Sequence, residues 1–552
     1  MNKRFLMTAL ASAVLAGCGG GGDGGSAGGG TTTPPSGTSS TTIAGTAATG
    51  AAIAGATVQA KCATGSGSAT TGADGRFSLK IDGAVRPCVL SVSAPGGTTL
   101  HSVVEGGSGA DVVANITPLT ELITASIAGG NTASFFSTFD AAAQAKLTQS
   151  GLSGAQQSVA LALSGVVDLT GIDALKDPLV AANGGNAGNA LDQKLDALGA
   201  TLAAAQTTLA ELSSAMAGNP DGTGPVATLL QPSHSSCAGL RTGTYRNIDV
   251  AGGHSELLKI DATALTMTFP SDGAVDTFTA DGSCQFTAGA GGSEPGTVLF
   301  NKSGVAIVRD GAVGSPAPAE LIIPEQTISL GELAGTWNGL GYESDGGADP
   351  YKGAAITFTF DAAGKGSAGA DCEPMNSAAC TPWDEQLNAT ANPQGGFDLT
   401  DAGGTVRAFA FKSAEGKLSL FINAPGHFFV ASKQEAAPLP VVGNTRKWWD
   451  MLLNDAGGAG AVTDGEMEVL TVDAANKFYT RRRPNGDVET MRFDNPRPGM
   501  SYRAANTTIQ ADGSTKTHPG IVALAAPGTG LSIVANLATA PGFVYGFSLN
   551  KP

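Results

Sequence analysis

Residues 71–81 carry the clearest strand signal and read Thr71-Gly72-Ala73-Asp74-Gly75-Arg76-Phe77-Ser78-Leu79-Lys80-Ile81. After a turn rich in Gly and Asp, polar and apolar side chains alternate, which places the apolar ones on one face of a half-buried strand. The segment Val58-Gln59-Ala60-Lys61-Cys62 alternates in the same way. The two patterns predict a small β-sandwich over residues 43–117.

Two motifs in this region carry a family resemblance: Gly50-Ala51-Ala52-Ile53-Ala54-Gly55-Ala56-Thr57-Val58 and Thr71-Gly72-Ala73-Asp74-Gly75-Arg76-Phe77. Together they resemble the carboxypeptidase-regulatory-like, or prealbumin-like, domain family. The resemblance implies an Ig-like or prealbumin-like sandwich that acts as a structural spacer or adhesion module. It supplies no catalytic residue.

The apolar period becomes helical after the sandwich. Thr117 can cap a helix with Pro118 in its first position, and the apolar residues that follow recur at helical spacing. Further helices are expected over 139–147, 156–167 and 191–216, which makes 118–218 an Ala-rich helical domain. The leucines of the last segment form a stripe that could bind a partner, but packing within a helical bundle is the simpler reading.

A Pro-, Gly- and Ser-containing linker is expected over 219–236, and strands dominate afterwards. We expect three β units, at 237–328, 329–436 and 437–552. Their opening motifs are Gly243-Thr244-Tyr245, Gly335-Thr336-Trp337 and Lys447-Trp448-Trp449, and a later strand in each ends in Asp261, Asp361 or Asp473.

The second opening motif resembles the strand start of lipocalin-like barrels. Short strands with frequent Gly turns favour closed antiparallel sheets, because closure removes exposed edges. A filled β-sandwich whose Trp residues are core remains open as an alternative. The whole chain is expected to be mainly β and multidomain, α+β overall, with a small sandwich, a helical segment and then antiparallel barrels or sandwiches.

The N-terminus has a separate signal. Lys3 and Arg4 precede an apolar run too short to span a bilayer, and Leu15-Ala16-Gly17-Cys18 follows. This order resembles a bacterial lipoprotein signal peptide over residues 1–17. The resemblance implies cleavage before Cys18, acylation of that cysteine and membrane attachment through the lipid.

Residues 18–42 read as a tether of Gly, Ser, Thr and Pro, because they contain too little apolar surface to offset the entropy of folding. In the lipoprotein family, Asp directly after the acylated cysteine directs retention in the inner membrane. Gly19 stands there instead. The resemblance therefore implies a location in the bacterial cell envelope at the outer membrane, on its periplasmic or surface-exposed side.

The formal charge of −16 argues against nucleic acid as a partner, because the phosphate backbone would be repelled. Of the seven cysteines, lipidation of Cys18 leaves an even number, as expected in an exported chain. The expected disulfides are Cys62 with Cys88, Cys237 with Cys284, and Cys372 with Cys380. No C-x-x-C motif occurs and the histidines are scattered, so neither a metal site nor a cofactor is expected.

Two groups of residues are candidate ligand contacts. Arg481 and Arg483 flank Arg482 before a Pro-Asn-Gly-Asp turn, and alternation puts them on one sheet face, able to hold a carboxylate, phosphate or sulfated sugar. Protection of an edge strand is the simpler account. The aromatic group could stack on a sugar, although core packing is the simpler role. Its members are Trp448, Trp449 and Tyr479.

The chain contains neither an H-E-x-x-H motif nor a P-loop. The leading hypothesis is a non-enzymatic, membrane-anchored envelope lipoprotein that binds a ligand, glycan or protein. A carbohydrate-active or other hydrolase on an unfamiliar β scaffold is one alternative, with Glu343, Asp345 and Asp349 as the carboxylates to consider. A purely structural envelope component is the other.

Overall fold

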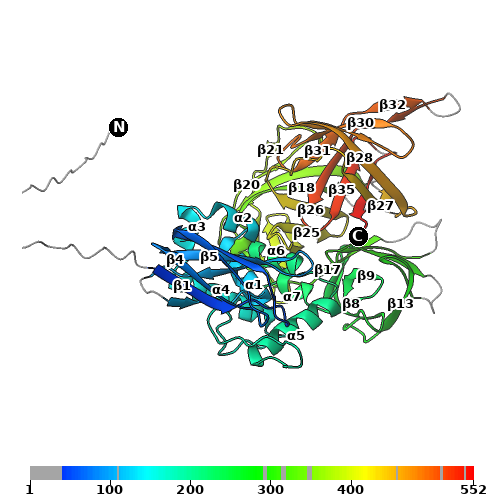
Figure 1. Cartoon of the computed structure of the whole chain (residues 1–552). Helices are drawn as coiled ribbons and strands as arrows, with labels where there is room; N and C mark the ends of the chain where they lie inside the picture. The colour runs from blue at the N-terminus through cyan, green and yellow to red at the C-terminus, as the bar shows by residue number, and fades with distance from the viewer. Residues whose placement is uncertain are drawn as a thin grey trace, which may run out of the picture. The chain divides into compact units, whose positions relative to one another are not determined.

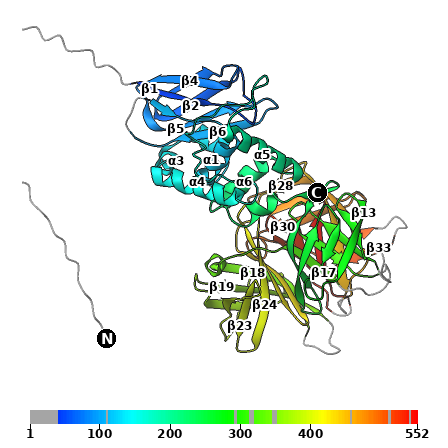
Figure 2. The ribbon, with the colours of Figure 1, turned by 90° about the horizontal axis from the view of Figure 1, so that it is seen from below.

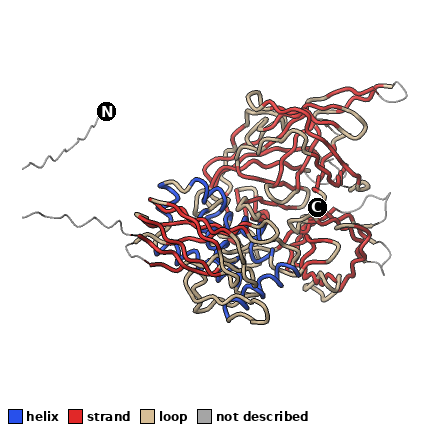
Figure 3. The backbone as a smooth tube through the Cα atoms, in the orientation of Figure 1, coloured by secondary structure: helices blue, strands red, loops and turns tan. Residues whose placement is uncertain are grey.

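The computed structural model describes residues 40–107, 111–289, 295–311, 319–344, 351–454, 458–509, 514–539 and 542–552. The expected signal peptide and Cys18 lie outside the described residues, as does most of the expected tether. The chain is mainly β, with the helices (blue in Figure 3) contributed by the segment between the first sandwich and the later strands. The expected fold class is confirmed.

The first module is a sandwich of two sheets (Figure 2). One sheet has the order β4-β1-β7 and the other has the order β3-β2-β5-β6. Phe77, Leu79 and Ile81 are buried between them, as the alternation predicts. The strands are β1 (Ser40–Thr46), β2 (Thr57–Thr64), β3 (Ser66–Thr70), β4 (Arg76–Asp82), β5 (Val85–Ser93), β6 (Thr99–Val104) and β7 (Asp111–Val113).

The start of this module differs from expectation. β1 begins at Ser40, so the last three residues of the expected tether belong to the sandwich. Their composition is that of the tether, but backbone pairing with β4 (Ser40 opposite Asp82) and burial of Thr41 recruit them into the sheet. Tertiary pairing has overridden the local composition.

Seven α-helices follow within the described residues. Thr117 caps α1 as expected: its Oγ1 accepts from the Thr120 amide at 3.2 Å, and Thr120 Oγ1 accepts from the Thr117 amide at 2.8 Å. The helices are α1 (Pro118–Ala128), α2 (Thr132–Thr138), α3 (Ala141–Lys146), α4 (Gln149–Leu163), α5 (Ala190–Ala204), α6 (Leu209–Gly218) and α7 (Pro225–Leu229).

The helix expected over 191–216 is two helices, α5 and α6. Gln206 has a positive φ of 49°, which ends the first helix, and Thr208 with Glu211 forms a capping box that begins the second. The leucine stripe nevertheless packs within the helical core, as expected. α4 also begins earlier than expected, at Gln149, because Thr148 accepts the Gly151 amide and caps it.

The expected linker over 219–236 is wrong as a description of this segment. It contains α7 and the short strand β8 (Ser233–His234), and Val226 and Leu230 are buried in the helical core. Pro225 stands in the first turn of α7, where a missing N–H does no harm. Pro and Gly here mark a helix start and its preceding turn.

The first β unit is a closed eight-stranded antiparallel barrel, which we call barrel 1. Its first strand, β10, pairs with its last, β17. Strand β9 (Cys237–Arg241) precedes it. The barrel strands are β10 (Gly243–Asp249), β11 (Ser255–Asp261), β12 (Thr266–Thr268), β13 (Val275–Gly282), β14 (Gln285–Ala288), β15 (Gly296–Phe300), β16 (Ala306–Arg309) and β17 (Ala319–Pro324).

The second β unit is a nine-stranded sheet in the order β21-β20-β19-β18-β26-β25-β24-β23-β22. Trp337 of the lipocalin-like motif is fully buried in its core, and the indole Nε1 donates to the Leu333 carbonyl at 2.9 Å. After η1 (Leu330–Leu333), the strands are β18 (Gly335–Glu343), β19 (Lys352–Phe360), β20 (Gly366–Asp371), β21 (Thr381–Pro382), β22 (Asn388–Ala391), β23 (Phe397–Asp401), β24 (Gly404–Lys412), β25 (Leu418–Ala424) and β26 (His427–Lys433).

The third β unit is again a closed eight-stranded barrel, barrel 3, whose β27 and β36 are paired (Figure 1, orange to red). A hairpin of β32 (Asn506–Ile509) and β33 (Thr515–His518) forms a separate small sheet. The barrel strands are β27 (Thr445–Asn454), β28 (Thr463–Asp473), β29 (Phe478–Arg482), β30 (Val488–Phe493), β31 (Met500–Arg503), β34 (Ile521–Ala526), β35 (Leu531–Asn536) and β36 (Val544–Asn550).

The three units share a turn after their second strand, as the sequence repeat suggests. Asp261 Oδ1 accepts the Thr263 amide at 2.9 Å, Asp361 Oδ1 accepts the Ala363 amide at 2.9 Å, and Asp473 Oδ1 accepts the Asn476 amide at 2.9 Å. Each carboxylate therefore stabilises its turn by accepting a backbone amide two or three residues further along the chain.

None of the helices in the described part of the chain is long and apolar enough to cross a membrane.

Candidate functional site

Arg481 and Arg483 lie on one face of β29 and its extension, and Arg482 lies on the other. The alternation predicts this arrangement. Arg481 Nη2 and Arg483 Nε both contact Glu489 Oε2, at 2.8 and 3.3 Å. Arg482 instead reaches Glu468 Oε2 at 3.5 Å, and its side chain is 53% exposed against 13% for Arg481. The two flanking arginines thus share one carboxylate.

The face that carries Arg481 is the inner face of barrel 3. On β27 to β30, the inner positions form a buried cluster with Trp448, Met467 and Tyr479, whereas outer positions such as Asp464 and Arg492 are exposed. In a closed barrel, residues at alternate positions point into the lumen, so the arginines lie inside. An edge-strand role is excluded for them, because β29 is paired with β28 and β30.

Two more arginines join this inner face, and we call Arg446, Arg481, Arg483 and Arg503 the arginine cluster. Arg503 is 5% exposed, and its Nε lies 3.8 Å from Glu489 Oε1 without a hydrogen bond. Arg446 Nε donates to Asn550 Oδ1. Neither residue is among the contacts expected from the sequence, because only closure of the barrel brings their side chains together with those of β29.

Glu489 is the carboxylate at the centre of the arginine cluster. Burial opposes its ionisation, but Arg481, Arg483 and Arg503 together outweigh that effect and hold the pKa of Glu489 below its usual value. Burial also lowers the pKa of Arg446 and of Arg503. The four guanidinium groups of the cluster face the carboxylates of Glu489 and Asp450, so positive charge exceeds negative charge at this point of the lumen.

The three aromatic candidates do not share one environment. Trp448 lies in the arginine cluster, with the guanidinium carbons of Arg483 and Arg446 5.3 and 5.7 Å from its ring centroid. Tyr479 is buried in the same inner cluster. Trp449 packs on the outer face with Met451 and other apolar side chains, because neighbours on a strand point to opposite faces. Trp449 is therefore separated from the arginines.

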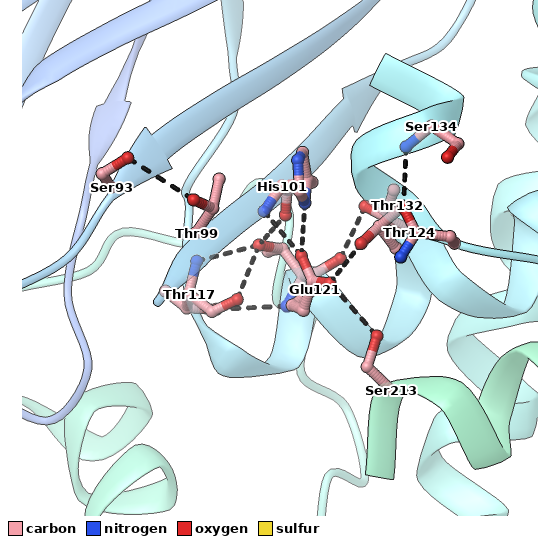
Figure 4. Close-up of polar contacts among 11 residues, drawn as sticks. Ser93, Thr99, His101, Thr117, Glu121, Thr124, Thr132, Ser134 and Ser213 are labelled. Atoms are coloured by element: carbon pink, nitrogen blue, oxygen red, sulfur yellow. Dashed lines mark hydrogen bonds and ion pairs between the residues drawn. The ribbon is translucent and has the colours of Figure 1, made fainter. Parts of the chain in front are cut away.

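A second buried polar group joins the sandwich to the helices and was not anticipated (Figure 4). The Glu121 carboxylate accepts from the His101 amide at 2.7 Å and from His101 Nδ1 at 2.8 Å. Its other oxygen accepts from Thr132 Oγ1 at 2.7 Å and Ser213 Oγ at 3.1 Å. The one sequence signal was an acidic residue inside the apolar run of α1.

This group borders a cavity of about 680 Å³ lined by Gly96, Thr99, Asn131 and Ser214 among others. Both carboxylate oxygens of Glu121 are saturated with donors, and Ser213 contacts the carboxylate rather than the imidazole. A hydroxyl nucleophile would need a hydrogen bond to His101 instead. The arrangement is that of a buried structural junction.

The remaining predicted residues are placed as follows. Glu343, at the end of β18, forms an ion pair with Lys352 at 3.2 Å, while Asp345 and Asp349 lie outside the described residues. The three expected disulfides are present and their pairing is confirmed. They join Cys62 to Cys88, Cys237 to Cys284, and Cys372 to Cys380.

The arginine cluster is thus the place where most of the predicted contact residues meet. It combines several guanidinium groups that share the Glu489 carboxylate, the ring of Trp448 and an excess of positive charge. In comparisons with known proteins, no family model, no curated protein and no solved structure matches this chain.

Proposed function

We propose that this chain is a lipid-anchored protein of the bacterial outer membrane that binds an anionic ligand through the arginine cluster of barrel 3. The observation that carries the proposal is the sharing of Glu489 by Arg481, Arg483 and Arg503 beside Trp448. The anchor rests on the lipoprotein signal that ends at Cys18. The ligand is a carboxylate, phosphate or sulfate group carried by a glycan or a small molecule.

Charge balance supports an anion. A guanidinium offers a planar fork of donors that matches carboxylate, phosphate and sulfate oxygens. Glu489 supplies one negative charge to three guanidinium groups, and Asp450, which accepts from Ser548 Oγ, adds a second on the same inner face, against four arginines in all. The Arg503 Nε that lacks a hydrogen bond is a donor still to be satisfied.

Trp448 has a supporting role in this proposal. It is 5% exposed, and Gly465 lies so close that an added Cβ there would stand 2.2 Å from the indole. The ring is therefore held between β28 and the guanidinium groups and orients them through cation–π contacts. Arg483, whose side chain is 28% exposed, is the member through which a ligand meets the cluster.

The test is isothermal titration of the mature chain with a sulfated heparin oligosaccharide and with inorganic phosphate. Arg481→Ala and Arg483→Ala should each weaken binding by about tenfold or more, because each removes a charged donor pair. Arg482→Ala is the matched control, since this neighbour points outward to Glu468 and should leave binding unchanged.

Glu489→Gln tests whether the cluster recognises an anion, because it changes the charge beside the arginines without removing any of them. It keeps the side-chain shape and removes the internal anion that competes for the arginines, so binding should strengthen. Absence of binding by the wild type, or equal binding by Arg481→Ala and Arg482→Ala, would overturn the proposal. A weaker ligand affinity in Glu489→Gln would also contradict it.

A further inference from the structure

Barrel 1 carries the opposite charge on its inner face. β-Sheet pairing sets Asp249 opposite Glu320, Asn247 opposite Glu256, and Met267 opposite Asp276. Directly opposed residues share a face, and the inner face is identified by buried Tyr245, Leu258 and Phe278 at the same alternation. We call the inward carboxylates the acidic rim: Asp249, Glu256, Asp276, Asp310 and Glu320.

The carboxylates that the sheet register brings together affect one another's ionisation. Burial, together with the charges of Asp310, Asp249 and Glu256, raises the pKa of Glu320 to about 7. Burial and the charges of Asp249 and Asp276 likewise raise the pKa of Asp310. The far end of the lumen is different, since it is filled by edge-to-face contacts of Tyr245 and Phe286 with Phe300.

Basic side chains on the described strands of barrel 1 point outward. Arg246 alternates with inward Tyr245 and Asn247, and it pairs with Glu325 at 2.9 Å. Arg309 Nε donates to the Gly460 carbonyl at 3.0 Å on the outer side. The acidic rim therefore has no compensating Lys or Arg from the inner face of these strands.

Asn247 is independent evidence for a ligand, because its buried side-chain oxygen has no hydrogen-bond donor. It is 7% exposed, and its Nδ2 donates to Glu320 Oε2 at 2.9 Å, which places its amide among the carboxylates. Its Oδ1 is buried without a hydrogen-bond partner. A buried acceptor without a donor costs free energy, and an N–H group of a ligand would satisfy it.

We propose that the acidic rim binds a small ligand with several ammonium groups, of the polyamine class. Such a ligand brings separated positive charges to carboxylates that come from β10, β11, β13, β17 and the end of β16. It also brings N–H donors for Asn247 Oδ1. A single metal ion fits less well, because no group of three or more acidic, His or Cys side chains in the described chain is placed to hold one.

The test is titration of the mature chain with spermidine at low salt and about pH 8, where Glu320, with a pKa of about 7, is mostly ionised. Wild type should bind, and Glu320→Gln should bind about tenfold more weakly or worse, since it removes one inward charge. Asp281→Asn is the matched control: it removes the same charge from β13, at an exposed outward position, and should leave affinity unchanged. Arg481→Ala should also leave spermidine binding unchanged, which keeps this test independent of the anion site.

Calcium chloride is the second probe. If calcium binds at the acidic rim more tightly than spermidine and displaces it, the ammonium assignment is overturned in favour of a metal site. Absence of spermidine binding by the wild type overturns the proposal outright. Equal losses in Glu320→Gln and Asp281→Asn would show only a response to net charge and would also overturn it.

Discussion

Two glutamates in two barrels show how neighbouring charges raise or lower the pKa of a buried carboxyl group. Glu489 in barrel 3 has three arginines around it, and they hold its pKa below the usual value despite burial. Glu320 in barrel 1 has burial and other carboxylates acting in the same direction, and its pKa rises to about 7. The side chain is the same, so the difference comes from the charges nearby.

The raised pKa of Glu320 predicts a pH-dependent stability. In the unfolded chain this carboxyl ionises near 4.5, so between about pH 4.5 and 7 the folded state binds more protons than the unfolded state. The free energy of unfolding should therefore fall as pH rises through that window. The contribution of this group is on the order of 3 kcal/mol. Denaturant titrations at pH 5, 6, 7 and 8 measure the slope.

Glu320→Gln is the control for this dependence. Because the amide cannot ionise, the variant should be the more stable protein at pH 8, and its stability should fall less between pH 5 and 8. The groups that face Glu320 remain in place, namely Asp310, Asp249, Glu256 and Asn247. Identical slopes for wild type and variant would contradict the prediction.

At the scale of elements, Glu121 connects four pieces of secondary structure. It lies on α1 and accepts hydrogen bonds from His101 on β6, Thr132 on α2 and Ser213 on α6. A single carboxylate thereby ties the sandwich to the helical core. Such a buried acceptor is strongly stabilising only while all its donors are present.

Glu121→Gln should lower the free energy of unfolding by about 3 kcal/mol, because a neutral amide loses the charge-assisted hydrogen bonds and offers one acceptor oxygen where the carboxylate offers two. Glu105→Gln is the matched control, since Glu105 also joins the sandwich to the helical segment, through Lys176 at 2.8 Å, with partly exposed side chains. It should cost less than about 1 kcal/mol. Urea unfolding measures both, and equal losses would refute the assigned role of Glu121.

At the scale of the whole molecule, the three β units have the same antiparallel meander topology but different side chains on their inner faces. The first strand of each β unit pairs with the last: β10 with β17, β18 with β26, and β27 with β36. The inner face of barrel 1 is acidic at the rim, that of barrel 3 is basic, and the second unit has an apolar core around Trp337. Closure by backbone pairing leaves inward side chains free to differ.

The proposed lipid anchor concerns the whole molecule and predicts its location. Wild-type protein expressed in a Gram-negative host should fractionate with the outer membrane and carry the added mass of the acyl groups on Cys18. Cys18→Ser should lose that mass and leave the outer-membrane fraction, because no cysteine remains at the cleavage site. The control variant, Cys62→Ser with Cys88→Ser, should keep the added lipid mass and the outer-membrane fractionation. Unchanged mass and fractionation of Cys18→Ser would contradict lipidation.

Local patterns were enough for much of the fold. Alternation identified the strands of the sandwich, the Thr117 cap marked the start of α1, and the number of cysteines with their spacing indicated the three disulfides. These features depend on residues close in sequence or, for the disulfides, on the even number of cysteines that remain after Cys18. Local composition misled where pairing across the chain prevails, as in residues 219–236 and in the start of β1.

The sequence by itself determined the strand and helix periods, the shared Asp turns and the common face of Arg481 and Arg483, because each depends on backbone geometry within a few residues. The tertiary structure alone decided which barrels close, that Trp448 takes the inner face and Trp449 the outer face of barrel 3, and that Arg446 and Arg503 join the same cluster. It also gathered the acidic rim of barrel 1. Charges on separate strands meet only when the sheet closes, and their separation along the chain gives no measure of that distance.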